Sequence, residues 1–367
     1  MFLKRRVLRH ILHSGIAIIA IAMVTAALIT AVRVSEGFAL RVYTPFSRTV
    51  SGWIGFLFSF TSFSAAEFIL YTLTAALLLY FLLSLSASIR AHGGWPLLRW
   101  GFDLLLAAVI FVALFFALWG CNYFVPKLET RFPFRTGPQP EEVLFETAQW
   151  HLDQASLFAG QINRDETGAP DEGGFEALAP KAAEAVNALA ARFPRLVKGA
   201  VSPPKRVVAY EALGYLGISG VYVPFTGECH VNTVSTEPFL PSTMCHELAH
   251  RLGFAPEEDA NMIAYLACAE SGDAIVRYSG ELLAFNYCYS ALSDPENRAL
   301  LWARLPQTVR DDFAGSREAW ERYEGPLQEV SASVNNTYLQ AMSQPEGIKS
   351  YGRVVDMLIA YYLEKNL

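Results

Sequence analysis

The stretch His246-Glu247-Leu248-Ala249-His250 decides how this chain is interpreted, because each of its fixed positions has a chemical reason. On a helix, residues i and i+4 lie on one face, so His246 and His250 can both reach one metal ion. Glu247 can act as general base toward a water at that metal. The apolar neighbours predict a buried or half-buried helix, where two histidines and a glutamate need partners or a metal. A helix with two satisfied core histidines is the alternative, and the spacing favours a Zn²⁺ site.

A catalytic zinc site needs a third protein ligand and keeps one position for water. Gly253 and Pro256 predict that the histidine helix ends and that a second helix begins after a short turn. That turn would bring the start of the second helix back to the histidines. Three acids occupy its first turn: Glu257, Glu258 and Asp259. Because the helix dipole favours acids there with or without a metal, all three stay candidates, as does His230 on a predicted strand.

The spacing after the motif resembles that of the gluzincins, zinc peptidases whose third ligand is a glutamate on the following helix. In that class an aspartate or asparagine four residues later supports a ligand histidine. Glu257 and Asn261 have this spacing, so the resemblance implies these two roles for them. The metzincin pattern H-E-x-x-H-x-x-G-x-x-H matches through Gly253 but meets Pro256 where its third histidine belongs. Proline cannot bind zinc, so the metzincin assignment fails.

Charge divides the chain into two parts. Residues 1–126 contain nine Lys and Arg against three acids, a net charge of +6, and the remainder carries −12, which gives the total of −6. The first part is basic and apolar, and the second part is predicted to be an acidic soluble domain. Its acidic charge argues against nucleic acid as a partner.

Three apolar stretches without Lys, Arg, Asp or Glu are long enough to cross a bilayer. They cover about residues 10–32, 68–89 and 104–126, within a predicted membrane domain of residues 1–126. The first is longer than the core of a cleaved signal peptide, and two more follow, so it is interpreted as an uncleaved anchor. Residues 49–66 are less apolar and contain Trp53 and four phenylalanines, which predicts an interfacial segment rather than a fourth span.

The basic residues near the N-terminus predict the orientation. Four of them precede the first span: Lys4, Arg5, Arg6 and Arg9. By the positive-inside rule the N-terminus is cytoplasmic, and three spans then place residues 127–367 outside the cytoplasm. The predicted partners are the lipid bilayer and a peptide or protein substrate. One disulfide is possible outside, for example Cys229–Cys288 or Cys268–Cys288, and the odd count of five cysteines leaves at least one free thiol.

The second part of the chain has mostly helical periodicity. Helices are expected over about 140–165 and 177–193, and in at least three segments from residue 280 to the end. Residues 204–232 are rich in β-branched and aromatic residues with glycines between them, which predicts short strands. The predicted fold class is α+β, mostly helical: three N-terminal transmembrane helices, then a zincin-like domain with a small sheet beside the histidine helix. In gluzincins the edge strand of such a sheet binds the substrate backbone.

Longer motifs resemble a bacterial family of uncharacterised membrane proteins, domain of unknown function 3810. The strings that match are Pro224 to Glu228, Cys245 to His250, Gly253 to Ala255 and Ser350 to Asp356. The family usually has Glu-x-Glu-Ala-Asn where this chain has Glu257-Glu258-Asp259-Ala260-Asn261. The resemblance therefore implies Glu257 as the ligand and weakens any role for Asp259. It covers nearly the whole chain and implies architecture, but no reaction.

Downstream residues complete the predicted catalytic set, because zinc peptidases commonly use a Tyr, His or Arg to stabilise the oxyanion. Tyr351 and Arg353 are the candidates, with Tyr338 behind them, and packing or surface roles are the alternative. The sequence thus predicts a membrane-anchored zinc metallopeptidase with Glu247 as general base. The main alternative is a catalytically inactive metal-binding membrane sensor or assembly protein. A structural membrane protein with a fortuitous motif is a third possibility.

Overall fold

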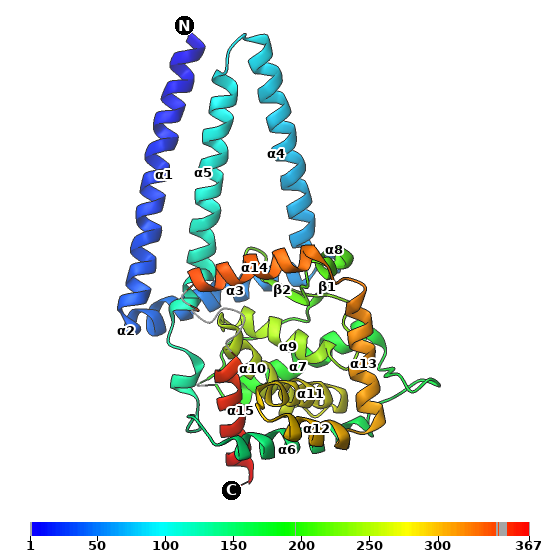
Figure 1. Cartoon of the computed structure of the whole chain (residues 1–367). Coiled ribbons are helices and arrows are strands. Elements are labelled where there is room, and N and C mark those ends of the chain that lie inside the picture. The colour runs from blue at the N-terminus through cyan, green and yellow to red at the C-terminus, as the bar shows by residue number, and fades with distance from the viewer. Residues whose placement is uncertain (1, 195, 343, 345–350, 367) are drawn as a thin grey trace.

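A computed structural model describes residues 2–194, 196–342, 344 and 351–366. Three long helices rise from one end of a helical domain, as Figure 1 shows. They are α1 (Phe2–Val34), α4 (Ala65–Arg90) and α5 (Trp95–Leu118). Among the described residues, these are the three helices that are long and apolar enough to cross a membrane, which confirms the prediction of three such helices.

The third of these helices differs from its predicted position. The apolar stretch 104–126 continues past the end of α5, and residues Gly120–Phe124 form the 3-10 helix η2. Trp119 and Tyr123 in this stretch are buried in the C-terminal domain. Lipid and a protein core both exclude charged side chains. A lack of charge therefore could not distinguish a membrane segment from a segment that enters the core.

Between α1 and α4 the chain runs along one end of the domain. It passes through α2 (Glu36–Phe38), the π-helix η1 (Ala39–Tyr43) and α3 (Thr44–Ser59). Figure 1 shows α3 lying across the foot of the long helices. Large apolar side chains of α3 are exposed, among them Trp53 at 70%. Most of the segment predicted to be interfacial is therefore a helix with an exposed apolar face, and its contact with lipid stays a prediction.

Small polar side chains hold α3 against the rest of the protein. The Ser47 hydroxyl donates to the carbonyl of Leu118, at the end of α5, at 2.6 Å. The Ser51 hydroxyl shares a 2.6 Å hydrogen bond with the hydroxyl of Tyr222. Both serines are buried. These contacts join α3 to a long helix on one side and to the C-terminal domain on the other.

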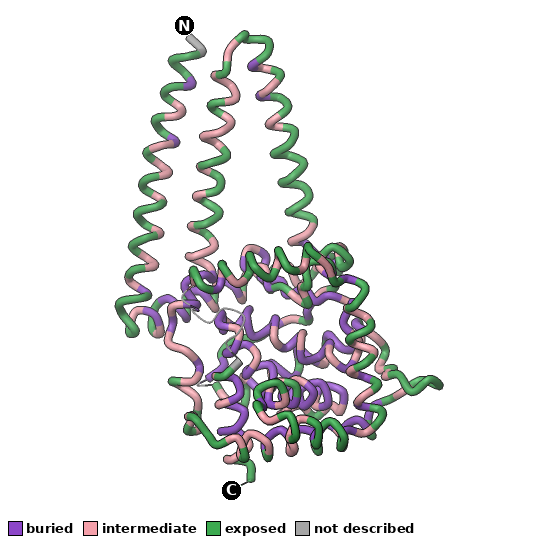
Figure 2. Tube along the Cα trace, in the orientation of Figure 1, coloured by how far each residue is buried: buried purple, intermediate pink, exposed green. Residues whose placement is uncertain are grey.

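The C-terminal domain packs its helices around α10 (Glu257–Ala269). No residue from Ala260 to Ala269 is charged, and a helix that is apolar all round is stable only when it is buried. Helices α7, α9, α11 and α15 contact α10, and Figure 2 shows the resulting buried centre. The helical elements around it are η3 (Leu128–Arg131), α6 (Glu141–Ala159), α7 (Gly174–Arg192), α8 (Tyr210–Tyr215), α9 (Leu240–Arg251), α11 (Ala274–Ala291), α12 (Pro295–Arg304), α13 (Gln307–Glu321), α14 (Pro326–Ala341) and α15 (Tyr351–Asn366).

A small sheet contacts both α9 and α3. In the described part of the chain it has three strands in the order β1-β3-β2: β1 (Lys205–Arg206), β2 (Gly220–Val223) and β3 (Glu228–Val231). β2 is antiparallel and β1 is parallel to β3. The prediction of short strands in residues 204–232, and of a mostly helical fold with a small sheet, is confirmed. Within the described residues β2 pairs on one side only, so its other edge is available to a further strand.

The turn between β2 and β3 touches α3 backbone to backbone. Gly227 in this turn has a φ of +62°. A methyl group on Gly227 would lie 2.6 Å from the backbone nitrogen of Gly55, and one on Gly55 would lie 2.9 Å from the carbonyl oxygen of Gly227. Two glycines therefore permit an approach that any side chain would prevent.

Glu228 fastens the first turn of α4 to the sheet. Its carboxylate accepts hydrogen bonds from the backbone N–H of Ala65 at 3.2 Å, from that of Ala66 at 2.8 Å and from Lys205 Nζ at 2.5 Å. Burial alone would raise the pKa of Glu228, but Lys205 and the two N–H groups hold that pKa below its ordinary value. A buried negative charge thus joins a long helix to the sheet at the point where the helix dipole is positive.

Replacing Glu228 with Gln removes this charge while keeping its shape, and we expect the free energy of unfolding to fall by about 1.5–3 kcal/mol at pH 7. Because the folded protein lowers the pKa of Glu228, its contribution is complete above the unfolded value near 4.5 and is lost as the pH falls through the folded value. Midpoints of thermal unfolding for the full-length protein in detergent should therefore converge between wild type and Glu228→Gln as the pH falls from 4.5 through the lowered pKa of Glu228.

Glu176→Gln is the matched control. Glu176 pairs at 2.7 Å with Arg206, which also lies in β1, but both side chains are exposed. Its loss should change the free energy of unfolding by less than about 1 kcal/mol. An equal loss in both variants, or a difference that persists at low pH, would contradict the role assigned to Glu228.

Candidate metal centre

The motif lies on α9 as predicted, and the turn after it returns the chain to the histidines. Gly253 has a φ of +86°, and the Phe254 N–H donates to the carbonyl of Ala249 at 3.2 Å, which closes the helix end in a Schellman-type turn. Pro256 then begins the next helix, because its fixed φ suits the start of a helix and it needs no hydrogen-bond partner there. Glu257 is thereby the first residue of α10 and faces α9.

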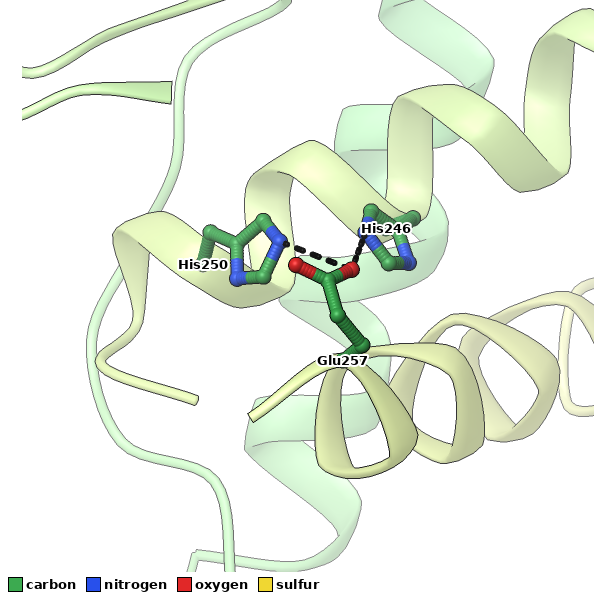
Figure 3. A group of neighbouring side chains, drawn as sticks. All are labelled: His246, His250 and Glu257. Atoms are coloured by element: carbon green, nitrogen blue, oxygen red, sulfur yellow. Dashed lines mark ion pairs between the residues drawn. The ribbon is translucent and has the colours of Figure 1, made fainter. Parts of the chain in front are cut away.

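Three predicted ligands meet at one point (Figure 3). Glu257 Oε2 lies 3.2 Å from His246 Nε2 and 3.7 Å from His250 Nε2. The ligand atoms of the three residues all lie within 4.8 Å of one another. Two imidazole nitrogens and one carboxylate are a donor set that suits Zn²⁺, and they leave a fourth position for water. The residues present therefore fit the metal that the motif implies.

Both histidine rings are oriented by acceptors on their far sides. His250 Nδ1 donates to the carbonyl of Phe254 at 2.8 Å, and His246 Nδ1 donates to Asn261 Oδ1 at 2.8 Å. A carbonyl or amide oxygen only accepts, so in each neutral ring the proton sits on Nδ1 and the lone pair sits on Nε2. Each Nε2 lone pair can then point toward Glu257. Asn261 occupies the supporting position that the gluzincin spacing implied.

Charges within this group are strongly coupled. Burial would raise the pKa of Glu257, but the neighbouring His250 and His246 hold it well below its ordinary value. Burial would lower the pKa of His250, and Glu257 raises it overall. Glu257 is thus a carboxylate between two imidazoles, and its negative charge favours a positive charge at this position. A divalent cation would supply that charge.

Glu247 lies apart from the three ligands, against the open edge of the sheet. A methyl group added to Gly220 of β2 would lie 2.5 Å from Glu247 Oε1. Burial raises the pKa of Glu247 to about 8; Glu257 adds to this, while His246 and the backbone N–H of Tyr222 oppose it. A carboxylate with a pKa near neutrality is suited to accept and return a proton. No sequence pattern indicates a role for Gly220, because its importance depends only on this approach to Glu247.

Aromatic residues beside the site come from distant segments. Trp119, which follows α5, donates its indole N–H to the carbonyl of His250 at 3.1 Å. The rings of Tyr123 and Tyr338 lie 5.8 Å apart, and their hydroxyls are hydrogen-bonded. Burial raises the pKa of Tyr338 to about 12, opposed by Tyr123 and assisted by the charge of Glu257. Among the described side chains of the downstream candidates, that of Tyr338 is the one whose hydroxyl is affected by the charge of Glu257.

Of the other two predicted oxyanion residues, Arg353 is held by a different partner. The guanidinium of Arg353 donates to Glu258, so the structure does not bring it together with the histidines. Tyr351 begins α15, and its side chain lies outside the described part of the chain. Its predicted role therefore stays a prediction.

Two of the alternative ligands, Glu258 and Asp259, are held by other partners, and His230 lies outside the group that the three predicted ligands form. Glu258 is bound to Arg353, and Asp259 Oδ2 accepts from the N–H of Leu128 at 2.9 Å. His230 lies on β3, where its Nε2 is 3.9 Å from Glu228. All five cysteines are described, buried and unbonded, so neither suggested disulfide is present in this structure.

Comparison with known proteins places the chain in a family. No curated protein matches it, and no solved structure does. A family model described as "Protein of unknown function (DUF3810)" matches residues 42–359, which include α3, two of the long helices, the sheet and all three metal-binding candidates. The match covers well over half of the chain. This protein therefore belongs to the DUF3810 family of proteins of unknown function.

Proposed function

We propose that this protein is a membrane-anchored zinc metallopeptidase of the gluzincin kind, with a zincin-like C-terminal domain. The observation that carries the proposal is the convergence of His246, His250 and Glu257 on one point, with Glu247 beside them at an open sheet edge. In this proposal the three long helices cross the membrane, the N-terminus is cytoplasmic and the C-terminal domain is outside. The basic residues in the first turns of α1, Lys4, Arg5, Arg6 and Arg9, support that orientation.

His246, His250 and Glu257 would hold the zinc, and Asn261 would keep His246 in its binding tautomer. Zinc, when bound, would supply the Lewis acidity that activates a water and polarises the peptide carbonyl. Glu247 accepts the proton of the attacking water and returns it to the leaving nitrogen. The burial of Glu247, which raises its pKa when no metal is bound, supports a role in proton transfer.

The open edge of β2 supports a peptide as the substrate. An extended peptide could add to this strand by backbone hydrogen bonds, as peptides add to other exposed sheet edges. Gly220 has no side chain to obstruct the approach, and Glu247 lies directly against it. Tyr338, with Tyr123 behind it, is the residue that we assign to hydrogen-bond the oxyanion.

The metal ligands are tested by the metal content of the full-length protein purified in detergent. We expect about one zinc per wild-type chain. Loss of a residue that only hydrogen-bonds a metal ligand weakens metal binding by roughly 10–100-fold. Glu257→Gln removes a ligand itself, so we expect it to weaken zinc binding by more than that. The matched control is Glu258→Gln, one residue further along the same helix, which should keep its zinc. Wild-type protein that folds without zinc would contradict the proposal, as would equal losses in the two variants.

Asn261 is tested by zinc affinity, measured by competition with a chelator. Asn261→Leu removes the acceptor for His246 Nδ1, so we expect zinc to bind about 10–100-fold more weakly. Asn261→Asp keeps an acceptor and should retain near-normal affinity. Undiminished binding by Asn261→Leu would show that His246 does not depend on this contact.

Glu247 is tested by hydrolysis. Glu247→Gln should keep its zinc and lose about 10²–10⁴-fold in the rate of peptide cleavage, because the proton acceptor is removed. Cleavage of a peptide mixture by the zinc-loaded protein in vesicles is the measurement. If the variant cleaves as fast as wild type, Glu247 is not the base. If wild-type protein holds zinc but cleaves nothing, the inactive metal-binding sensor or assembly protein becomes the better interpretation.

A further inference from the structure

One end of the C-terminal domain is marked by the three long helices. α1 ends at Val34, α4 begins at Ala65 and α5 ends at Leu118, and Figure 1 shows all three points at the same end of the domain. If these helices cross a bilayer, its surface passes along this end. The exposed apolar face of α3 lies there too, across the foot of the long helices.

The turn between β2 and β3 extends beyond the ends of the long helices, in the direction in which α5 would enter the bilayer. The ring of Phe225 in the turn packs against Phe111 of α5 at 4.6 Å between ring centroids. Phe111 lies seven residues before the end of α5, which places it about 10 Å up the helix at 1.5 Å per residue. The sheet that borders the metal ligands therefore extends at its tip alongside the apolar part of α5.

Helix α14 lies across the same end of the domain (Figure 1). It exposes Leu327, Val330 and Val334, at 62%, 61% and 64%, and their i, i+3, i+7 spacing forms one stripe. Glu329 is the only charged residue of the helix. Figure 2 shows α14 as mostly exposed. A stripe of branched apolar side chains with so little charge is costly in water and is typical of a surface that meets a partner.

Contacts at both ends of α14 fix it beside the metal ligands. Near its start, Gln328 packs against Gly217, in the turn that follows α8. Near its end, the ring of Tyr338 packs against that of Tyr123, which packs against Trp119, and the Trp119 ring meets that of His250. The helix thus runs from the segment before β2 to the segment after α5, with its C-terminal part close to the candidate metal centre.

We propose that α14 lies on the bilayer surface, so that α3, the Phe225 turn and α14 together hold the metal centre at the lipid boundary, where it takes membrane-bound polypeptides. The substrate class in this statement rests on the proposed peptidase function; the lipid contact of α14 does not. The position of α14 at the end where the long helices emerge identifies the bilayer as its partner. A second copy of the chain is the alternative that the test must separate.

The lipid contact is tested with an environment-sensitive fluorophore on Val334→Cys in full-length protein. All five native cysteines are buried, so the introduced thiol is the accessible one. The matched control is Leu300→Cys on α12, a leucine that is 55% exposed at the end away from the long helices. In phosphatidylcholine–phosphatidylglycerol vesicles, lipids spin-labelled on their acyl chains should quench the label at position 334 and leave the label at 300 unchanged.

Two results would overturn the lipid contact. One is equal quenching at positions 334 and 300. The other is a label at 334 that is shielded from both the lipid quencher and a water-soluble quencher, which would assign the stripe to a second copy of the chain.

The substrate class is tested with a random decapeptide mixture, free or carrying an N-terminal myristoyl chain, in vesicles that hold the zinc-loaded protein. We expect the acylated mixture to be cleaved at least about tenfold faster, because membrane binding raises its effective concentration at the site. A water-soluble peptidase added to empty vesicles should show no such preference. Val334→Asp should reduce the preference and keep the zinc.

The two failures are distinguishable. Equal cleavage of free and acylated peptides would overturn the membrane-bound substrate class and leave the peptidase function standing. No cleavage of either mixture would count against the peptidase function, and the quenching at position 334 would still decide the lipid contact.

Discussion

The indole of Trp119 joins the end of a long helix to the candidate metal centre, and the rest of the site depends on this contact. Its N–H donates to the carbonyl of His250, and its ring meets the His250 ring edge to face at 5.9 Å. A buried indole N–H needs an acceptor, so the contact fixes the end of α5 on α9. Ser51 adds a second connection through Tyr222. The wall of the candidate metal centre is therefore built in part by residues that come before the C-terminal domain in the sequence.

Three successive acids at the start of α10 show how one helix end organises its surroundings. Glu257 faces the histidines, Glu258 binds Arg353 of α15, and Asp259 accepts from the backbone of Leu128 in η3. Successive helix residues point about 100° apart, so each acid reaches a different element. The helix dipole favours all three, which offsets part of the cost of burying them. Glu257, the candidate metal ligand, thus lies on a helix end that its two neighbours anchor to other elements.

Local patterns predicted most of the metal centre, because its ligands come from two adjacent helices. Periodicity placed His246 and His250 on one face, and turn residues placed the start of the next helix opposite them. The resemblance then singled out Glu257 among the three acids of that helix start. Trp119 lies 131 residues before His250, and nothing local indicates that contact. Arg353 was expected near the oxyanion, but a motif cannot show that Glu258 binds it instead. The span predicted to reach residue 126 ended at Leu118, because apolar composition is the same for lipid and for a protein core.

The backbone contact between Gly55 and Gly227 has a consequence for how the protein is assembled. Ser51 of the same helix reaches Arg251 across 200 residues of sequence, so α3 is synthesised long before its partners. Chains fold from the N-terminus as they are synthesised, so α3 forms before the C-terminal residues that it contacts have been made. If its apolar face contacts the bilayer, α3 would already be held in position when these residues are synthesised. On that proposal, the membrane would position α3 before the β2–β3 hairpin and α9 are synthesised.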